Sequence, residues 1–237
     1  MSDNFPAVEP HGSLQPIFAD AWFLTGSVVF KPMIRLSRNM VVLRHGGELT
    51  LVNAIRLDSD GEAALDALGK VAHVIRIGVH GMDDGYYVDR YKATYWSIPG
   101  RERDDGLKTD RVLAADTELP LPDASVFWFE HVKVPEVAIL IDRDGGLLIT
   151  CDSVQHWAPS DLMSFGARIV TSVMGFKKPA QIGPPWRKMQ TPEGGSLKPD
   201  FERLAALPFN KLIGGHGGLL ESDAPARLKE SIARELN

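Results

Sequence analysis

Three apolar segments of the chain each end on a histidine or an aspartate. One of them, residues 71–79, leads to His80, a second ends at Cys151-Asp152, and a third ends at His216, which glycines surround. Strand ends are held rigidly while the loops after them leave room for a substrate, so side chains there suit catalysis or coordination. Imidazole and carboxylate groups are common ligands of divalent metal ions. The three segments together therefore predict a metal site.

Each segment taken alone also fits a purely structural role. Asp83-Asp84-Gly85 can reverse the chain while His80 bonds a backbone carbonyl, and an aspartate such as Asp152 commonly forms turns. The glycines around His216 are equally typical of a flexible turn. Three strand ends that each deliver a histidine or an aspartate are harder to explain by chance, which favours a functional site.

The order of these residues resembles the metallo-β-lactamase superfamily. In that family a strand ends in His-x-His-x-Asp-His, a later turn gives a third histidine, a strand end gives a bridging aspartate, and Gly-His closes the site. Here His80-Gly81-Met82-Asp83-Asp84-Gly85 stands at the first motif, Asp152 at the bridging position and Gly215-His216-Gly217 at the last. The resemblance covers residues 21–236. It implies an α+β fold, a four-layer αββα sandwich of two mixed β-sheets flanked by helices.

The resemblance also implies a ligand set. The five implied metal ligands are His80, Asp84, His131, Asp152 and His216. Asp84 would also be the catalytic residue, orienting the attacking water or accepting its proton. His131 takes the place of the third histidine because of its distance before the hairpin at residues 137–149. The usual Gly-His-Thr turn is absent there, and the alternation of His131 with Phe127 and Phe129 also fits a core histidine.

Two departures from the family motif reduce the expected site. Met82 stands where the second histidine belongs, and a thioether is a poor ligand for zinc. Gly85 stands where the last histidine belongs and offers no ligand. Each half of a two-metal centre loses a ligand, so we expect one divalent metal ion, zinc in preference to iron. Asp83 and His156 are near enough in sequence to substitute.

A metal ion held in this way points to hydrolysis of a small-molecule substrate, because the ion acidifies bound water and polarises carbonyl or phosphoryl oxygens. Cys151 is expected to be a small buried residue at its strand end. The alternative hypothesis is a metal-free, non-catalytic αββα binding or interaction protein. The loss of metal-binding histidines at Met82 and Gly85 is what such a protein would show. A Rossmann-like phosphate loop at residues 214–218 lacks the Gly-x-Gly-x-x-Gly spacing and ranks last.

Composition limits the other classes of function. The 237 residues are 44% hydrophobic and carry a formal net charge of −5, so no basic field exists to hold a nucleic acid. Cys151 is the one cysteine, which leaves no intrachain disulfide to form. Apolar runs are far shorter than the roughly 20 residues of a spanning helix, and the N-terminus lacks the pattern of a secretory signal. We expect a cytoplasmic protein without membrane partners.

The elements that must position these residues follow from apolar periodicity and turn residues. Two β-rich arms, residues 21–53 and 124–150, are separated by a helix and a strand. Pro and Gly predict a long surface loop over residues 177–198. Helices are predicted over residues 61–68, 160–174, 199–207 and 224–236. We expect an N-terminal tail at residues 1–18 and a single domain over residues 19–237.

Overall fold

Two β-sheets pack face to face in the computed structural model, which describes residues 5–100, 106–158, 160–176 and 179–236. The larger sheet contains, in spatial order, β1 (Gln15–Phe18), β2 (Ala21–Lys31), β3 (Ile34–His45), β4 (Glu48–Val52), β5 (Lys70–Arg76), β6 (Thr94–Ser97) and β7 (Arg111–Val112). The smaller contains β14 (Leu219–Leu220), β13 (Lys211–Ile213), β10 (Leu147–Ile149), β9 (Val137–Ile141) and β8 (Ala124–Trp128). Both sheets are mixed, because β4 to β7 pair in parallel in the first and β10 pairs in parallel with β13 in the second.

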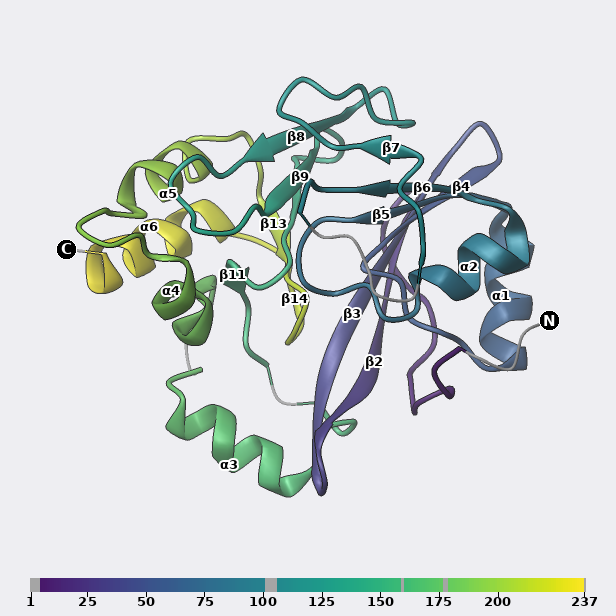
Figure 1. Ribbon diagram of the computed structural model, residues 1–237, viewed down its shortest axis with the longest axis horizontal. Helices are drawn as coiled ribbons and strands as arrows, with labels where there is room; N and C mark the ends of the chain where they lie inside the picture. Colours follow the sequence, from purple (N-terminus) through teal and green to yellow (C-terminus); the bar gives the residue numbers. More distant parts are fainter. Residues whose placement is uncertain (1–4, 101–105, 159, 177–178, 237) are drawn as a thin grey trace.

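Helices cover the outer face of each sheet (Figure 1). Two helices, α1 (Ser59–Leu68) and α2 (Asp84–Tyr91), lie on the larger sheet. The helices α4 (Pro184–Gln190), α5 (Lys198–Leu204) and α6 (Ala224–Glu235) lie on the smaller. The resulting four layers are the αββα sandwich that the sequence predicts.

The strands divide their side chains between layers because successive residues of a strand point to opposite faces. Val41 and Leu43 of β3 lie in the core between the sheets, whereas Met40 and Val42 pack under α1 and α2. In β9, whose five residues are all buried, neighbouring side chains likewise enter the central core and the core under α4 to α6. A strand covered on both faces reads as an unbroken apolar run, as this one does.

The helix α3 (Phe165–Val173) stands apart from these layers, beside the tip of the β2–β3 hairpin (Figure 1). Ser164 joins the two: its Oγ accepts the backbone N–H of Ala167 at 3.2 Å as the N-cap of α3. The same hydroxyl donates to the carbonyl oxygen of Met33 at 2.9 Å and accepts the N–H of Arg35 at 3.1 Å. One serine thus begins the helix and fixes the hairpin against it.

Some local predictions were wrong or incomplete. The loop predicted over residues 177–198 contains β12 (Gln181–Ile182) and α4, and its residues 177 and 178 lie outside the described residues. Its prolines open α4 instead of breaking the chain, because proline suits the first helical position. Residues 15–18, expected in the tail, form β1, which pairs with β2. The helix predicted from residue 160 begins at Phe165, after its Ser164 cap.

A buried ion pair joins the larger sheet to the segment that carries His80. The guanidinium of Arg38, in β3, donates through Nη2 to Oδ2 of Asp83, the residue before α2, and both side chains are buried. The N–H of Arg56 donates to the same oxygen at 3.0 Å, and Arg38 Nε donates to the Ser27 carbonyl at 3.2 Å. Pairing and hydrogen bonding are what allow two charges to be buried here.

Removing one partner of this ion pair should destabilise the protein more than replacing both partners by apolar residues. Arg38→Met leaves the buried carboxylate of Asp83 without its cation, and we expect the free energy of unfolding to fall by about 3–5 kcal/mol. The double variant Arg38→Met/Asp83→Leu removes both charges and should recover part of that loss. Urea unfolding followed by circular dichroism measures both. A double variant no more stable than Arg38→Met would contradict this account.

Candidate metal centre

Three predicted site residues come together where the two sheets meet. His80 follows β5 of the larger sheet, while Asp152 and His216 follow β10 and β13 of the smaller. Because β10 and β13 are parallel neighbours, the loops after them leave from the same edge of the sheet. The backbone N–H of Val137 donates to the Ile77 carbonyl at 3.0 Å and so ties the start of β9 to the segment before His80.

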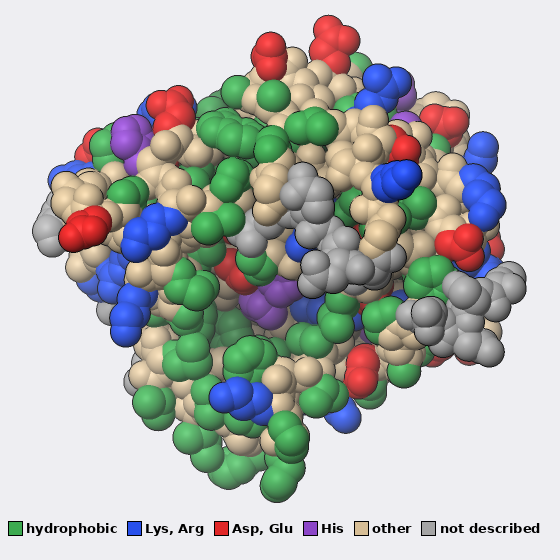
Figure 2. Space-filling view, in the orientation of Figure 1, with side chains coloured by type: hydrophobic (Ala, Val, Ile, Leu, Met, Phe, Trp, Pro, Cys, Tyr) green, Lys and Arg blue, Asp and Glu red, His purple; other side chains and the backbone are tan. Residues whose placement is uncertain are grey.

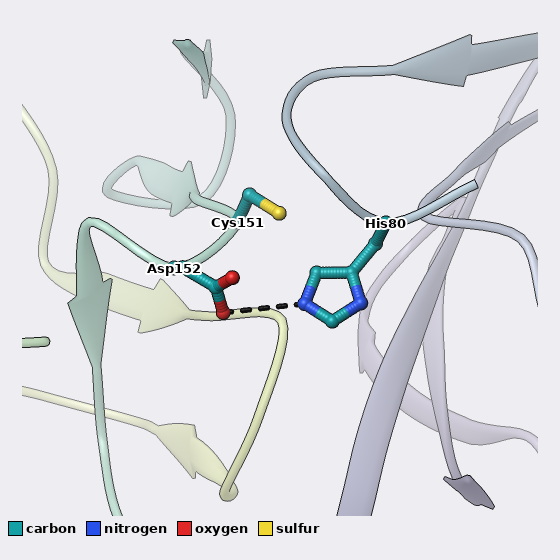
Figure 3. A group of neighbouring side chains, drawn as sticks. All are labelled: His80, Cys151 and Asp152. Carbon is teal, nitrogen blue, oxygen red and sulfur yellow. Dashed lines mark hydrogen bonds and ion pairs between the residues drawn. The ribbon is translucent and has the colours of Figure 1, made fainter. Parts of the chain in front are cut away.

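Two imidazole nitrogens converge on one carboxylate oxygen. Nε2 of His80 lies 3.2 Å from Oδ1 of Asp152, the contact drawn as a dashed line in Figure 3. Nε2 of His216 lies 3.4 Å from the same oxygen, and the two imidazole ring centroids are 4.7 Å apart. The side-chain amide of Gln155 also donates to Oδ1, at 3.0 Å. The side chains of His80 and Asp152 are each 20% exposed, so the group is open to solvent on one side.

The hydrogen bonding of His216 fixes which nitrogen can bind a metal. Nδ1 lies 2.5 Å from the carbonyl oxygen of Ser37, which can only accept, so Nδ1 carries the proton. Burial, helped by the neighbouring His80, lowers the pKa of His216 and favours its neutral form. Nε2 then presents a lone pair to the carboxylate of Asp152. Two acceptors that face each other need a cation between them, and a hydrogen-bonded Nδ1 is typical of metal-bound histidine.

Cys151 places a sulfur beside His80 and Asp152. Its side chain is fully buried, as expected for a small residue at the strand end. Its Sγ, a ring nitrogen of His80 and a carboxylate oxygen of Asp152 all lie within 4.8 Å of one another (Figure 3). Burial raises the pKa of the Cys151 thiol to about 11. A bound metal ion would reverse that preference, because a coordinating thiol is deprotonated.

The separations match the spacing of ligands around zinc. Bonds of about 2.0–2.1 Å in a tetrahedral arrangement place neighbouring ligand atoms about 3.3 Å apart. The two nitrogen–oxygen distances, 3.2 and 3.4 Å, lie on either side of that value. Two imidazoles, one carboxylate and one thiol are also ligand types that zinc accepts. His80, Cys151 and Asp152 therefore fit a zinc ion as one group, and His216, whose Nε2 also lies near Asp152 Oδ1, falls outside that group of three.

The pKa of His80 also indicates that the site favours positive charge. Burial alone would lower the pKa of His80, but the sulfur of Cys151 and the carboxylate of Asp152 outweigh burial and raise that pKa well above its ordinary value. In the absence of a metal, protonated His80 therefore supplies the positive charge that pairs with the carboxylate of Asp152. The site attracts positive charge whether the charge is a proton or an ion.

Glu136 lies behind the site, and sequence reasoning missed it. The residue is fully buried, accepts the Ser153 N–H at 3.0 Å through Oε1 and accepts the indole N–H of Trp186 at 2.8 Å through Oε2. Burial, reinforced by the charge of Asp152, raises the pKa of Glu136 to about 7. The sequence offered one indication of Glu136, a single carboxylate between Pro135 and the apolar run of β9.

Asp84 and His131 do not join the group around Asp152. Asp84 is the first residue of α2, is fully buried, and accepts the hydroxyl of Tyr95 at 3.1 Å through Oδ2. His131 is on the far side of the smaller sheet, where Nδ1 lies 3.1 Å from Oδ1 of Asp200. His131, Asp200 and Glu130 form a separate cluster within the described residues.

An apolar pocket opens beside the candidate metal centre. It has a volume of about 340 Å³, and Asp152 and His216 line one end of it. Trp157 joins the pocket to the centre, since its ring centroid lies 6.3 Å from that of His216. The tyrosines of α2 lie in the core under the larger sheet and do not line this pocket.

Comparison with solved structures agrees with this architecture. The DIM-1 metallo-β-lactamase exposed to ceftazidime aligns with a TM-score of 0.65 and 13% identity, over 96% of this chain and 97% of that one. The FIM-1 metallo-β-lactamase from Pseudomonas aeruginosa, in its mono-zinc form, aligns with a TM-score of 0.63 and 12% identity over 97% of each chain. The chain has the metallo-β-lactamase fold. The fold class inferred from the sequence is thereby confirmed.

A metallo-β-lactamase from Hirschia baltica aligns similarly, with a TM-score of 0.65 and 10% identity over 94% of this chain and 98% of that one. No family model and no curated protein matches the sequence. At 10–13% identity these metallo-β-lactamase structures establish the fold alone. None of the helices in the described parts of the chain is long and apolar enough to cross a membrane.

The second cluster generates a prediction about acid stability. Burial opposes ionisation of Asp200, but the guanidinium of Arg203 and the N–H groups of His131 outweigh it and lower the pKa of Asp200 below its ordinary value of 3.8. A folded-state pKa below the unfolded one contributes stability above pH 3.8, and that stability is lost as the pH falls through the folded-state pKa. Asp200→Asn should lower the free energy of unfolding by about 1–3 kcal/mol at neutral pH.

The difference between Asp200→Asn and the wild type should shrink once the pH falls below the unfolded-state pKa. Urea unfolding of both proteins at neutral pH and at about pH 3 tests this expectation. Asp144→Asn, at the exposed carboxylate of an ion pair with Lys211, is the control and should change stability by less than about 1 kcal/mol. A gap for Asp200→Asn that stays constant across the range would show that the carboxylate charge is not its cause.

Proposed function

We propose that this protein is a metal-dependent hydrolase of a small-molecule substrate, with one divalent metal ion, zinc in preference to iron. The ligands in this proposal are His80, Cys151 and Asp152, which lie in one group, with His216 as a further ligand next to Asp152. The observation that carries it is the convergence of two imidazole nitrogens on Asp152 Oδ1 at the spacing of tetrahedral zinc ligands. A cysteine among the ligands favours zinc, because thiolates are typical ligands of zinc. A single iron ion is more typically bound by nitrogen and oxygen ligands alone.

Bound zinc would supply an acidified water molecule, with a pKa near 7, and a Lewis acid for the substrate oxygen. The chain's own residues set the geometry. Ser37 holds the tautomer of His216, and Gln155 holds the carboxylate of Asp152. Nδ2 of Asn39 donates to the carbonyls of Gly214 and Gly217 at 2.9 and 3.2 Å, which fixes the loop around His216. A ligand group held in this way loses little entropy on binding.

The solved metallo-β-lactamases support the proposal as fold relatives. The FIM-1 enzyme was solved in a mono-zinc form, which matches the single ion proposed here. The proposal leaves out Asp84 and His131, because the structure pairs them with Tyr95 and Asp200 instead. Asp84 then supports α2 and the loop after β5 from within the core, without touching the reacting atoms.

One observation favours a metal-free binding protein as the second candidate. The raised pKa of His80 allows an imidazolium to satisfy Asp152 without any ion. That pairing is the arrangement expected if the fold has been kept and the chemistry lost. The two candidates differ in metal content and in the response of the melting temperature to a chelator.

Metal content separates the two candidates. Protein purified without a histidine tag should contain about one zinc per chain, and a chelator should lower its melting temperature. The double variant Asp152→Asn/His216→Gln should lose the ion. The matched control, His131→Gln/Asp200→Asn, changes the same residue types in the other cluster and should keep it. Stoichiometric zinc retained by the first double variant, measured by mass spectrometry, would rule out these ligands.

The role of Cys151 can be tested by its spectrum. Replacement of zinc by cobalt should give an ultraviolet charge-transfer band from a thiolate ligand, because a coordinated thiol is deprotonated despite the raised pKa of Cys151. Cys151→Ser should abolish the band and weaken zinc binding by at least about tenfold. Because this is the one cysteine, a band that persists in the variant would show that the assignment is wrong.

A further inference from the structure

The pocket beside the metal centre has walls from four separate segments. The β2–β3 hairpin contributes Leu36, α3 contributes Val170, α4 contributes Met189, and the chain between β11 (Val154–Gln155) and α3 contributes Trp157. Phe176, after α3, packs against Trp157 with ring centroids 4.6 Å apart. The β2–β3 hairpin is far in sequence from the other three segments, so the pocket exists only in the folded protein.

The polar groups of the pocket are gathered at one end. Asp152, Gln155 and His216 belong to the metal centre or contact it. Thr171 lies farther along, on α3, but its hydroxyl donates to the Ala167 carbonyl of its own helix at 2.8 Å. Among the lining residues that the structure describes, the rest are apolar apart from a glycine. An apolar wall rejects charged and strongly polar groups, because they lose hydration there and gain no partner.

The volume and the position of the pocket narrow what it can hold. About 340 Å³ is near the lower end of the range for small-molecule sites, which run from about 300 to 1,000 Å³. Trp157 and His216 both line this space, with their ring centroids 6.3 Å apart. In Figure 2 hydrophobic side chains gather over the lower part of the molecule, next to a hollow in which histidine side chains are visible.

We infer that this pocket binds an apolar acyl or aryl group of the substrate, attached directly to the hydrolysable carbonyl that lies at Asp152 and His216. Hydrolysis at that carbonyl rests on the proposed function, whereas binding of the apolar group does not. Met189 and Met174, whose thioether chains adapt to different shapes, lie in the wall. The pocket therefore accepts either a ring or an alkyl chain, and acyl compounds that carry such a group on the hydrolysable carbonyl are the substrate class.

Helix α3 offers a matched pair of valines for the test. Val170 lines the pocket, while Val173, three residues later, is 82% exposed and is absent from its lining. We measure binding of N-phenyl-1-naphthylamine, a neutral fluorescent dye, to chelator-treated protein, so that no metal chemistry is involved. Val170→Asn should weaken dye binding about tenfold, because a polar group faces the bound ring. Val173→Asn should leave the affinity unchanged.

Equal weakening by the two variants would place the dye on the outer surface of α3 and overturn the inference. Met189→Gln, on the exposed rim of α4, serves as a second pocket variant and should also weaken binding. Melting temperatures of all three variants identify any that fail to fold. Loss of dye binding in Val170→Asn and Met189→Gln, with retention in Val173→Asn, supports the apolar subsite.

A second arm uses the zinc-loaded protein and p-nitrophenyl esters of acetate, butyrate and octanoate. We expect kcat/KM to rise with acyl length in the wild type and in Val173→Asn, and to rise less in Val170→Asn. Hydrolysis without any preference for length overturns the subsite and leaves the proposed function standing. Dye binding with the predicted variant pattern, but no ester hydrolysis after zinc loading, supports the subsite and counts against the hydrolase.

Discussion

The carboxylate of Asp152 lies where the two sheets meet, and a histidine from each sheet directs its Nε2 at the same oxygen of that carboxylate. The hydrogen bond from Nδ1 of His216 to Ser37 places the proton of the neutral imidazole on Nδ1 and leaves Nε2 without one. A lone pair and a carboxylate at 3.4 Å repel one another unless a positive charge lies between them or close by. The neighbouring residues either supply such a charge as a proton on His80 or accept it as a metal ion.

The surrounding polar residues hold this arrangement without competing for the cation. Arg38 neutralises Asp83 inside the protein, so that carboxylate adds little negative charge at the site. Glu136, with a pKa near 7, is partly neutral at physiological pH and accepts two hydrogen bonds from the chain. Asn39 fixes the glycine-rich loop around His216 from β3. Arg38, Glu136 and Asn39 thus each have a hydrogen-bond partner in the buried surroundings of the site.

The apolar pocket and the candidate metal centre share residues, which would link substrate binding to the proposed chemistry. Asp152 and His216 close one end of a space whose other walls are aromatic, aliphatic or thioether groups. Apolar contacts at a distance from the reacting bond can position that bond at the metal centre. The hairpin and α3, joined through Ser164, make up a large part of that wall and lie outside the four layers of the fold.

The fold was predictable because local patterns and tertiary packing agree. Apolar runs such as β9 indicate strands that are covered on both faces. Asp152 and His216 could be located because they follow the apolar segments of β10 and β13. The same patterns missed α2 and α4, where a glycine-containing or proline-containing start looks like a turn but opens a short helix.

The sequence by itself determined the order of strands and the residues at their ends, since burial imposes a period that the chain must follow. Only the tertiary structure decided which side chains face each other, because adjacent residues in an extended chain normally point to opposite sides. The turn after β10 brings Cys151 and Asp152 into one group. Residues 128–131 carry His131 past the end of β8 to Asp200 on α5, and helix formation at Asp84 directs that carboxylate to Tyr95.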